Sequence, residues 1–180
     1  AIEPTPPAPP MIRICLSLSL LLLMLGCSSN PTTGYSSASL YDQQFHSVCV
    51  PVFENETMSR NMEFMLTDAV VKQIQARTPY RVLDDTHADT MLIGTITDIK
   101  LRAISKSRTT GLDNEMLITA TINFEWLNLR TGKRIIGRER FSSSALFIPS
   151  QPSSEPLEMG QFALVQQLST DIVDQLQAAW

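Results

Sequence analysis

The sequence predicts an α+β fold, a two-layer sandwich with two helices packed on one face of a mixed sheet of about four strands. Two segments carry apolar residues at three- and four-residue spacing, which is typical of amphipathic helices. Between them lie segments in which apolar and polar residues alternate, the pattern of half-buried strands. Both helices must bury their apolar stripes against the sheet, and this requirement gives the two layers.

The first strand is expected at 47–53 (SVCVPVF), an apolar and β-branched run that ends in the turn-forming letters ENET. A helix follows in 57–78. Thr57 or Ser59 can cap its start, and Pro79 ends it because the residue before proline disfavours helical geometry. Core packing explains the methionines of its stripe better than metal binding does. The stripe consists of Met58, Met62, Met65, Leu66, Ala69, Val70 and Ile74.

Two strands are expected after this helix, a brief one at 80–85 (YRVLDD) and a longer one at 88–104. A strand, a helix and a second strand form a right-handed crossover, so the strands at 47–53 and 80–85 should be parallel.

The most regular alternation lies in 114–129, whose apolar side is formed by Met116, Ile118, Ala120, Ile122, Phe124 and Trp126. The letters RTGK at 130–133 predict a hairpin turn in which Gly132 takes a positive φ, and the return strand follows at 134–147. After a proline-containing loop, the last helix is expected in 158–180. Its apolar face consists of Phe162, Val165, Leu168, Ile172, Leu176 and Ala179.

The N-terminal region has the pattern of an export signal. Arg13 accompanies an apolar run at 12–25, which as a helix is about 21 Å long and too short for a hydrocarbon core of roughly 30 Å. Gly26 directly before Cys27 resembles the end of a bacterial lipobox, in which the cysteine is acylated. We therefore expect lipidation at Cys27. A plain secretory signal and a retained membrane helix are the alternatives.

This interpretation divides the chain into three parts. Residues 1–26 are expected to be an upstream extension and signal peptide, 27–46 a flexible tether, and 47–180 the folded domain. Cys49 would then be the only thiol of the domain, which excludes an intramolecular disulfide there. Its apolar neighbours predict a small buried residue rather than a nucleophile.

Residue types that carry catalysis or bind metals are sparse. The two histidines, His46 and His87, cannot form a zinc set. Asp84, Asp85 and Asp89 lie near a turn, but their spacing does not match a calcium loop. The sequence has no glycine-rich phosphate loop and no nucleophile elbow. We therefore expect no enzyme, no metal and no cofactor.

The charge distribution is more informative, because the chain has a net charge of −4 but its bases are concentrated. Nine of the fourteen bases lie in 100–140 together with four acids, which makes that span +5. Such bases can attract an anionic partner, or they can simply protect strand edges. An export signal disfavours nucleic acid and favours a phosphorylated glycolipid. Our candidates for phosphate contact are Lys100, Arg102, Lys106, Arg130, Lys133 and Arg134.

A family resemblance is visible in the segments VPVFENET, SRNMEFMLTDAVVKQIQARTPYRV and ADTMLIGTI. They resemble the lipopolysaccharide-assembly lipoprotein (LptE) family, which reads VP-F-N, R-x-x-E-x-x-LT-x-A, TPY and AD-x-L-x-G-x-I. The resemblance covers roughly 34–180, is strongest in 48–96, and rests on motifs that are structural rather than catalytic. The matching residues are Val50, Pro51, Phe53, Asn55, Arg60, Glu63, Leu66, Thr67, Ala69, Thr78, Pro79, Tyr80, Ala88, Asp89, Leu92, Gly94 and Ile96.

The resemblance implies an outer-membrane lipoprotein, held by its lipid anchor at the periplasmic face, with two helices on a four-stranded sheet. It also implies a partner, a large LptD-like β-barrel whose lumen the domain plugs, and a role in delivering lipopolysaccharide to the outer leaflet. TolB N-terminal and CsgG-like domains share a V-x-P-F-x-N-x-T strand followed by a helix and an AD-x-x-x-G strand. A periplasmic scaffold or secretion module is therefore the alternative.

Overall fold

The computed structural model describes residues 41–106, 113–149 and 154–177. Within them, the six strands form one sheet of order β3-β1-β4-β5-β6, and β2 pairs with β4 beside that path. The elements in chain order are β1 (Ser47–Cys49), β2 (Glu54–Asn55), α2 (Met62–Arg77), β3 (Arg81–Val82), β4 (Thr90–Lys106), β5 (Asp113–Asn128), β6 (Arg134–Phe147) and α3 (Leu157–Asp174).

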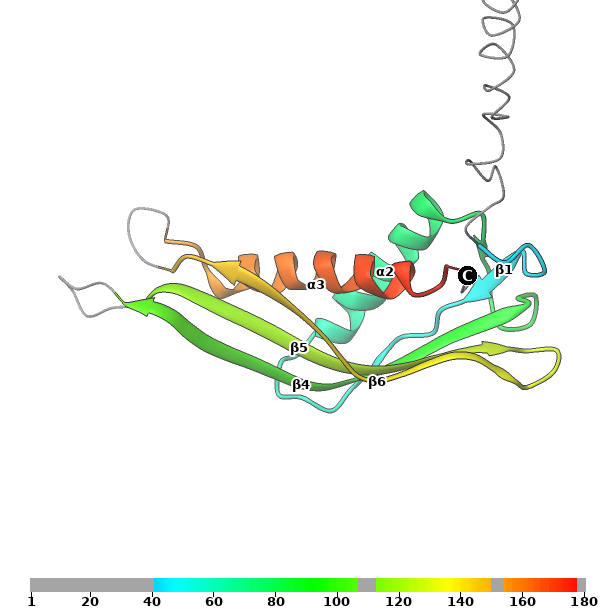
Figure 1. The fold of residues 1–180 in the computed structure, drawn as a ribbon, viewed down its shortest axis with the longest axis horizontal. Coiled ribbons are helices and arrows are strands. Elements are labelled where there is room, and N and C mark those ends of the chain that lie inside the picture. The colour runs from blue at the N-terminus through cyan, green and yellow to red at the C-terminus, as the bar shows by residue number, and fades with distance from the viewer. Residues whose placement is uncertain (1–40, 107–112, 150–153, 178–180) are drawn as a thin grey trace, which may run out of the picture. The chain divides into compact units, whose positions relative to one another are not determined.

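Both helices lie on one face of the sheet, and the other face is open (Figure 1). Strand β1 is parallel to β3 and to β4, whereas β4, β5 and β6 form an antiparallel meander. The predicted two-layer α+β sandwich and the parallel crossover are confirmed. Three of the strands are long and three have only two or three residues.

The core lies between the sheet and the helices. The side of β5 expected to be apolar is buried from Ile118 to Trp126, and Met116 is partly buried. At one end of the core, the Trp126 ring lies 5.7 Å from the rings of both Phe45 and Tyr80. The predicted turn at 130–133 is present with Gly132 at φ +67°, and the return strand has the predicted bounds.

The expected first strand is divided in two. Strand β1 ends at Cys49 and the chain pairs again only at β2, within the letters ENET that were expected to be a turn. Proline has no N–H for a ladder hydrogen bond, and Pro51 lies in the interruption between the two strands.

Helix α2 begins at Met62, five residues later than expected, and Asn61 before it has φ +66°. Thr57 and Ser59 do not cap it, because the Ser59 N–H donates to Thr57 Oγ1 within a local turn. Met58 lies in that turn and is fully exposed, so its assignment to the apolar stripe was wrong.

Helix α3 is shorter than expected and ends at Asp174. Phe162 was expected in the core but is 55% exposed, whereas Gly160 and Leu164 are buried. Ala179 lies outside the described residues. Neither helix that the structure describes is long and apolar enough to cross a membrane.

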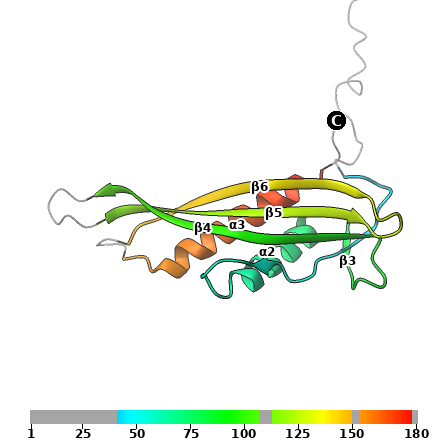
Figure 2. The ribbon, with the colours of Figure 1, turned by 90° about the horizontal axis from the view of Figure 1, so that it is seen from below.

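The sheet has two unlike halves. Strands β1 and β2 pair with β4 only as far as Ile96. Beyond it, β4, β5 and β6 continue together without a described strand outside them (Figure 2). We call residues 97–106, 113–121 and 141–147 the distal ribbon, and the rest of the sheet the proximal half.

Candidate functional site

Asn55 joins β2 to helix α2 and shows why the family motif has this residue. Its Nδ2 donates to the Ser59 carbonyl at 2.8 Å and to Glu63 Oε2 at 2.7 Å. Its Oδ1 accepts from the Thr57 N–H at 2.9 Å and from the Thr57 hydroxyl at 2.7 Å. The pKa of Glu63 is lowered, first by a backbone hydrogen bond from its own N–H and then by Asn55. These motif residues therefore act in folding.

Gly94 and Phe53 form a second structural contact of the motif. A Cβ on Gly94 would lie 2.3 Å from the Phe53 ring, so only glycine lets the ring rest on the sheet. The Phe53 N–H donates to the Thr67 hydroxyl at 3.0 Å, and that hydroxyl donates to the Glu63 carbonyl at 2.7 Å. The strand and the helix are thereby fixed to one another.

Each aspartate near the turn before β4 is exposed or has a structural role. Asp89 accepts hydrogen bonds from the His46 N–H and the Ser47 hydroxyl, and Arg130 pairs with it at 3.1 Å. The His46 hydrogen bond is the main cause that lowers the pKa of Asp89. Asp84 pairs with His87 at 2.9 Å. In the part of the chain that the structure describes, no three His, Cys, Asp or Glu side chains are placed to hold a metal ion.

Cys49 is buried as predicted, and its thiol is free. Burial is the main cause that raises the pKa of this thiol, and Asp85 and Asp84 raise it further. A thiol with a raised pKa is a poor nucleophile, which agrees with a packing role.

The six basic candidates do not form one patch. Lys100 pairs across the sheet with Thr119, whereas Arg134 pairs with Leu127 at the other end of β5. Eight residues of strand separate these positions, which is roughly 27 Å. The structure therefore gives a distal group (Lys100, Arg102 and Lys106) and a proximal group (Arg130, Lys133 and Arg134).

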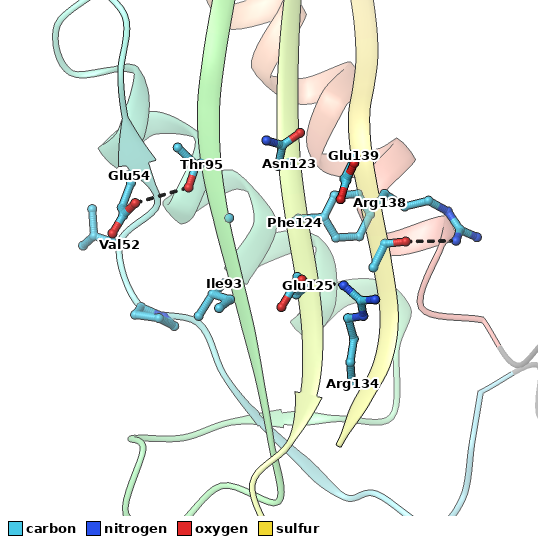
Figure 3. Close-up of a pocket in the computed structure, with 13 residues that line it drawn as sticks. Val52, Glu54, Ile93, Thr95, Asn123, Phe124, Glu125, Arg134, Arg138 and Glu139 are labelled. Atoms are coloured by element: carbon cyan, nitrogen blue, oxygen red, sulfur yellow. Dashed lines mark hydrogen bonds and ion pairs between the residues drawn. The ribbon is translucent and has the colours of Figure 1, made fainter. Parts of the chain in front are cut away.

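Two members of the proximal group are engaged with carboxylates. Arg130 pairs with Asp89, and Arg134 pairs with Glu125 at 2.8 Å. Arg134 also lines a concavity of about 730 Å³ on the open face, whose walls include Glu54 and Glu139 (Figure 3). Three glutamates line this hollow beside two arginines, so it is not suited to hold a phosphate.

The distal group lies beside two apolar residues of the open face, the exposed Leu146 and the partly buried Leu117. Arg102, Leu117 and Leu146 follow one another across β4, β5 and β6 on the open face, and Leu146 is 59% exposed. Lys100 lies two residues before Arg102 in β4, on the same face of the sheet. It is exposed and forms an ion pair with Asp98. Arg102 has no ion-pair partner among the described residues. We call Lys100, Arg102, Lys106, Leu117 and Leu146 the distal amphipathic surface.

Leu117 and Leu146 were not identified from the sequence as site residues, although a signal exists. Leu117 is apolar on the side of β5 that otherwise carries Glu115, Thr119 and Thr121. Leu146 interrupts a serine-rich strand in the same way. An apolar residue on the polar face of an alternating strand is the feature that could have indicated this surface.

The family model LptE, described as Lipopolysaccharide-assembly, matches residues 45–180. The chain belongs to the LptE family. Membership makes it a lipopolysaccharide-assembly protein of the Gram-negative envelope, as the motif at 48–96 predicted. No curated protein sequence matches the chain.

Solved structures with the same fold are distant in sequence. A Xanthomonas campestris protein aligns with a TM-score of 0.56 and 10% identity, over 79% of this chain and 91% of that one. A hypothetical protein from Chlamydia trachomatis aligns with a TM-score of 0.51 and 10% identity, over 73% and 95%. Lipoprotein B from Nitrosomonas europaea gives a TM-score of 0.48 and 13% identity, over 77% and 88%. At these identities, the first two matches indicate a shared fold alone.

Proposed function

We propose that this LptE family member is anchored to the outer membrane by a lipid on Cys27 and plugs a large LptD-like β-barrel. There it contacts lipopolysaccharide with the distal amphipathic surface and acts without catalysis. Family membership supports the barrel and the glycolipid. The lipobox-like sequence that ends in Gly26 and Cys27 supports the anchor.

The row Arg102, Leu117, Leu146 is the observation that carries the glycolipid contact. A phosphorylated glycolipid has an anionic head group and apolar chains, so a surface that binds it should offer cations beside exposed apolar area. Arg102 can form a bidentate pair with phosphate, and the lysines of the surface act as point charges. Both proximal arginines are paired with acids, whereas Arg102 has no ion pair with a described residue.

The test compares two charge reversals of equal size. K100E/R102E/K106E should weaken binding of purified lipopolysaccharide, and more so at low salt, where screening is least. R130E/K133E/R134E changes the net charge equally and should leave binding close to wild type. Equal losses in both variants, or a loss only in the proximal one, would contradict the distal assignment.

The plug and the anchor have their own tests. A large β-barrel protein should co-purify with the wild-type chain from native membranes. Mass spectrometry should show that the mature N-terminus is an acylated Cys27. Acyl chains contribute about 0.8 kcal/mol per buried methylene, which makes a multiply acylated cysteine a stable anchor. If no barrel co-purifies with the lipidated chain, the plug role is wrong and a periplasmic scaffold or secretion module replaces it.

A further inference from the structure

The helix layer does not cover all of the distal ribbon, because α3 extends further toward its end than α2 does (Figure 1 and Figure 2). One flank of α3 consists of Phe162, Val165, Ser169 and Val173, which follow one another at three- and four-residue spacing. Helix α2 packs against α3, and Ser169 and Val173 are fully buried. Phe162 lies at the other end of this flank and is 55% exposed. The flank is therefore closed beside α2 and open at Phe162.

Phe162 lies level with an exposed apolar residue of β4. The first turn of α3 lies over the end of β6, since a Cβ on Gly160 would be 2.6 Å from the Phe147 ring. Phe147 is joined through its partner on β5 to Ala103 of β4. Phe162 is about 3 Å further along the helix, which places it level with the stretch from Leu101 to Ala103. Leu101 faces the helix side, as its buried partner on β5 does, and is 47% exposed.

These side chains leave apolar surface uncovered on the helix side of the ribbon. Met116 lies between them on β5, because it pairs with Ala103 of β4 and with Phe147 of β6, and it is only partly buried. We call Leu101, Met116 and Phe162 the helix-side apolar area. Exposed apolar surface of this kind marks a place where a ligand, a membrane or another protein binds.

Strand β4 carries cations directly beside this area but on the opposite face. Lys100 and Arg102 flank Leu101 in sequence, and successive side chains of a strand point to opposite faces of the sheet. Neighbouring residues are only about 3.3 Å apart along the strand. In the described ranges, no strand pairs with the outer side of β4 beyond Ile96. One molecule lying along this edge can therefore contact the cations on the open face and Leu101 on the helix side.

We propose that acyl chains of a phosphorylated glycolipid cover the helix-side apolar area, while its phosphates contact Lys100 and Arg102 around the β4 edge. This inference rests on the proposed function and adds to it the position of the acyl chains. Leu117 and Leu146 lie on the open face, so a glycolipid with several chains can contact apolar residues on both faces of the ribbon.

Charge complementarity selects this occupant over an apolar protein surface. Whatever covers Leu101 also comes close to Arg102, which has no ion pair with a described residue. A wholly apolar partner would take water from that guanidinium without giving it a counter-charge, and burying an unpaired charge is costly. A phosphorylated glycolipid joins anionic groups to apolar chains in one molecule, so it supplies the counter-charge and the apolar cover together.

The test uses the full-length chain and two probes, purified lipopolysaccharide and the same lipopolysaccharide after complete deacylation, which keeps its sugars and phosphates. L101S/F162S removes apolar area from the chain but no charge. It should therefore lower the affinity for the acylated probe about tenfold and leave the affinity for the deacylated probe unchanged. K100E/R102E/K106E should weaken the binding of both probes.

L83S/F64S is the matched control. Leu83 and Phe64 are similarly exposed, at 40% and 58%, but they belong to the segment after β3 and to α2. This variant should bind both probes like the wild type, and thermal unfolding checks that both double variants are folded.

A second measurement does not depend on any variant. A lipopolysaccharide analogue with a photoreactive group on an acyl chain should label the wild-type chain at peptides that contain Leu101 or Phe162. Labelling only at other peptides, such as those that contain Leu83 or Phe64, would overturn the inference.

The outcomes separate this inference from the proposed function. If K100E/R102E/K106E loses binding while L101S/F162S binds like the wild type, the glycolipid contact stands and the position of the acyl chains is wrong. If the wild-type chain binds neither probe, the glycolipid contact itself is wrong. A two-copy mass of the wild type by light scattering that falls to one copy in L101S/F162S would assign the area to a second copy and overturn the acyl contact.

Discussion

The proximal half and the distal ribbon share strands β4, β5 and β6, but their side chains serve different purposes. In the proximal half the motif residues serve folding, because Asn55 holds the turn before α2 and Gly94 leaves room for the Phe53 ring. The core there is closed, and Trp126 is only 2% exposed. In the distal ribbon the helix layer is incomplete. Leu101 pairs with Ile118, yet it is 47% exposed while Ile118 is fully buried.

This difference shows that the residues that identify the family are not the residues that we propose to bind a ligand. The motif residues that identify the family lie where the chain must pack tightly, so their presence indicates the fold. The exposed cations, the exposed Leu146 and the partly buried Leu117 lie where packing places few limits on the side chains. A search guided by motifs alone would therefore find the core of this protein and miss its candidate binding surface.

The largest expected effect is in the proximal core. Trp126→Ala should lower the free energy of unfolding by about 3–5 kcal/mol, because it removes a large buried ring between Phe45 and Tyr80. The Trp126 N–H has no partner among the described residues, so the loss is one of packing. Urea unfolding measures it. Glu125→Ala, next in sequence but on the open face, should change stability by no more than about 0.5 kcal/mol. Similar losses would mean that the strand register is wrong.

A smaller effect tests the contact between motif segments. Gly94→Ala should cost about 1–3 kcal/mol, because the new methyl group overlaps the buried Phe53 ring. Gly137→Ala is the matched control in β6, since its Cβ would meet the exposed side chain of Arg134, which can move away. Thermal unfolding of both variants compares them. If Gly137→Ala is the more costly change, the contact of Phe53 with Gly94 does not limit the size of the residue at position 94.

How far the sequence predicts this fold depends on how local each signal is. The bounds of β6, the buried side of β5 and the φ of Gly132 follow from alternation and turn chemistry within a few residues. The start of α2 does not, because Asn55 reaches across its turn to Glu63 and delays the helix. Phe162 is misassigned because helical spacing does not reveal that the helix layer is incomplete near it.

The candidate site was predictable in residue type but not in grouping. Bases concentrated in 100–140 are visible in the sequence. Their division into two groups follows from the length of β4 and β5, which places Lys100 and Arg134 far apart. The ion pairs of Arg130 with Asp89 and of Arg134 with Glu125 join positions whose contact only the fold establishes.

The smallest expected effect concerns acid and the turn at Asn55. The pKa of Glu63 is lower in the folded chain than its ordinary value, so its carboxylate stabilises the fold above that ordinary value. This contribution is lost as the pH falls through the lowered pKa. Glu63→Gln keeps an oxygen that can accept from Asn55 but cannot titrate. Its unfolding free energy should therefore decrease less than that of the wild type between pH 7 and pH 3, by a fraction of the Gly94→Ala effect. Parallel pH profiles for the two proteins, measured by urea unfolding, would show that this carboxylate does not contribute to the acid sensitivity of the proximal half.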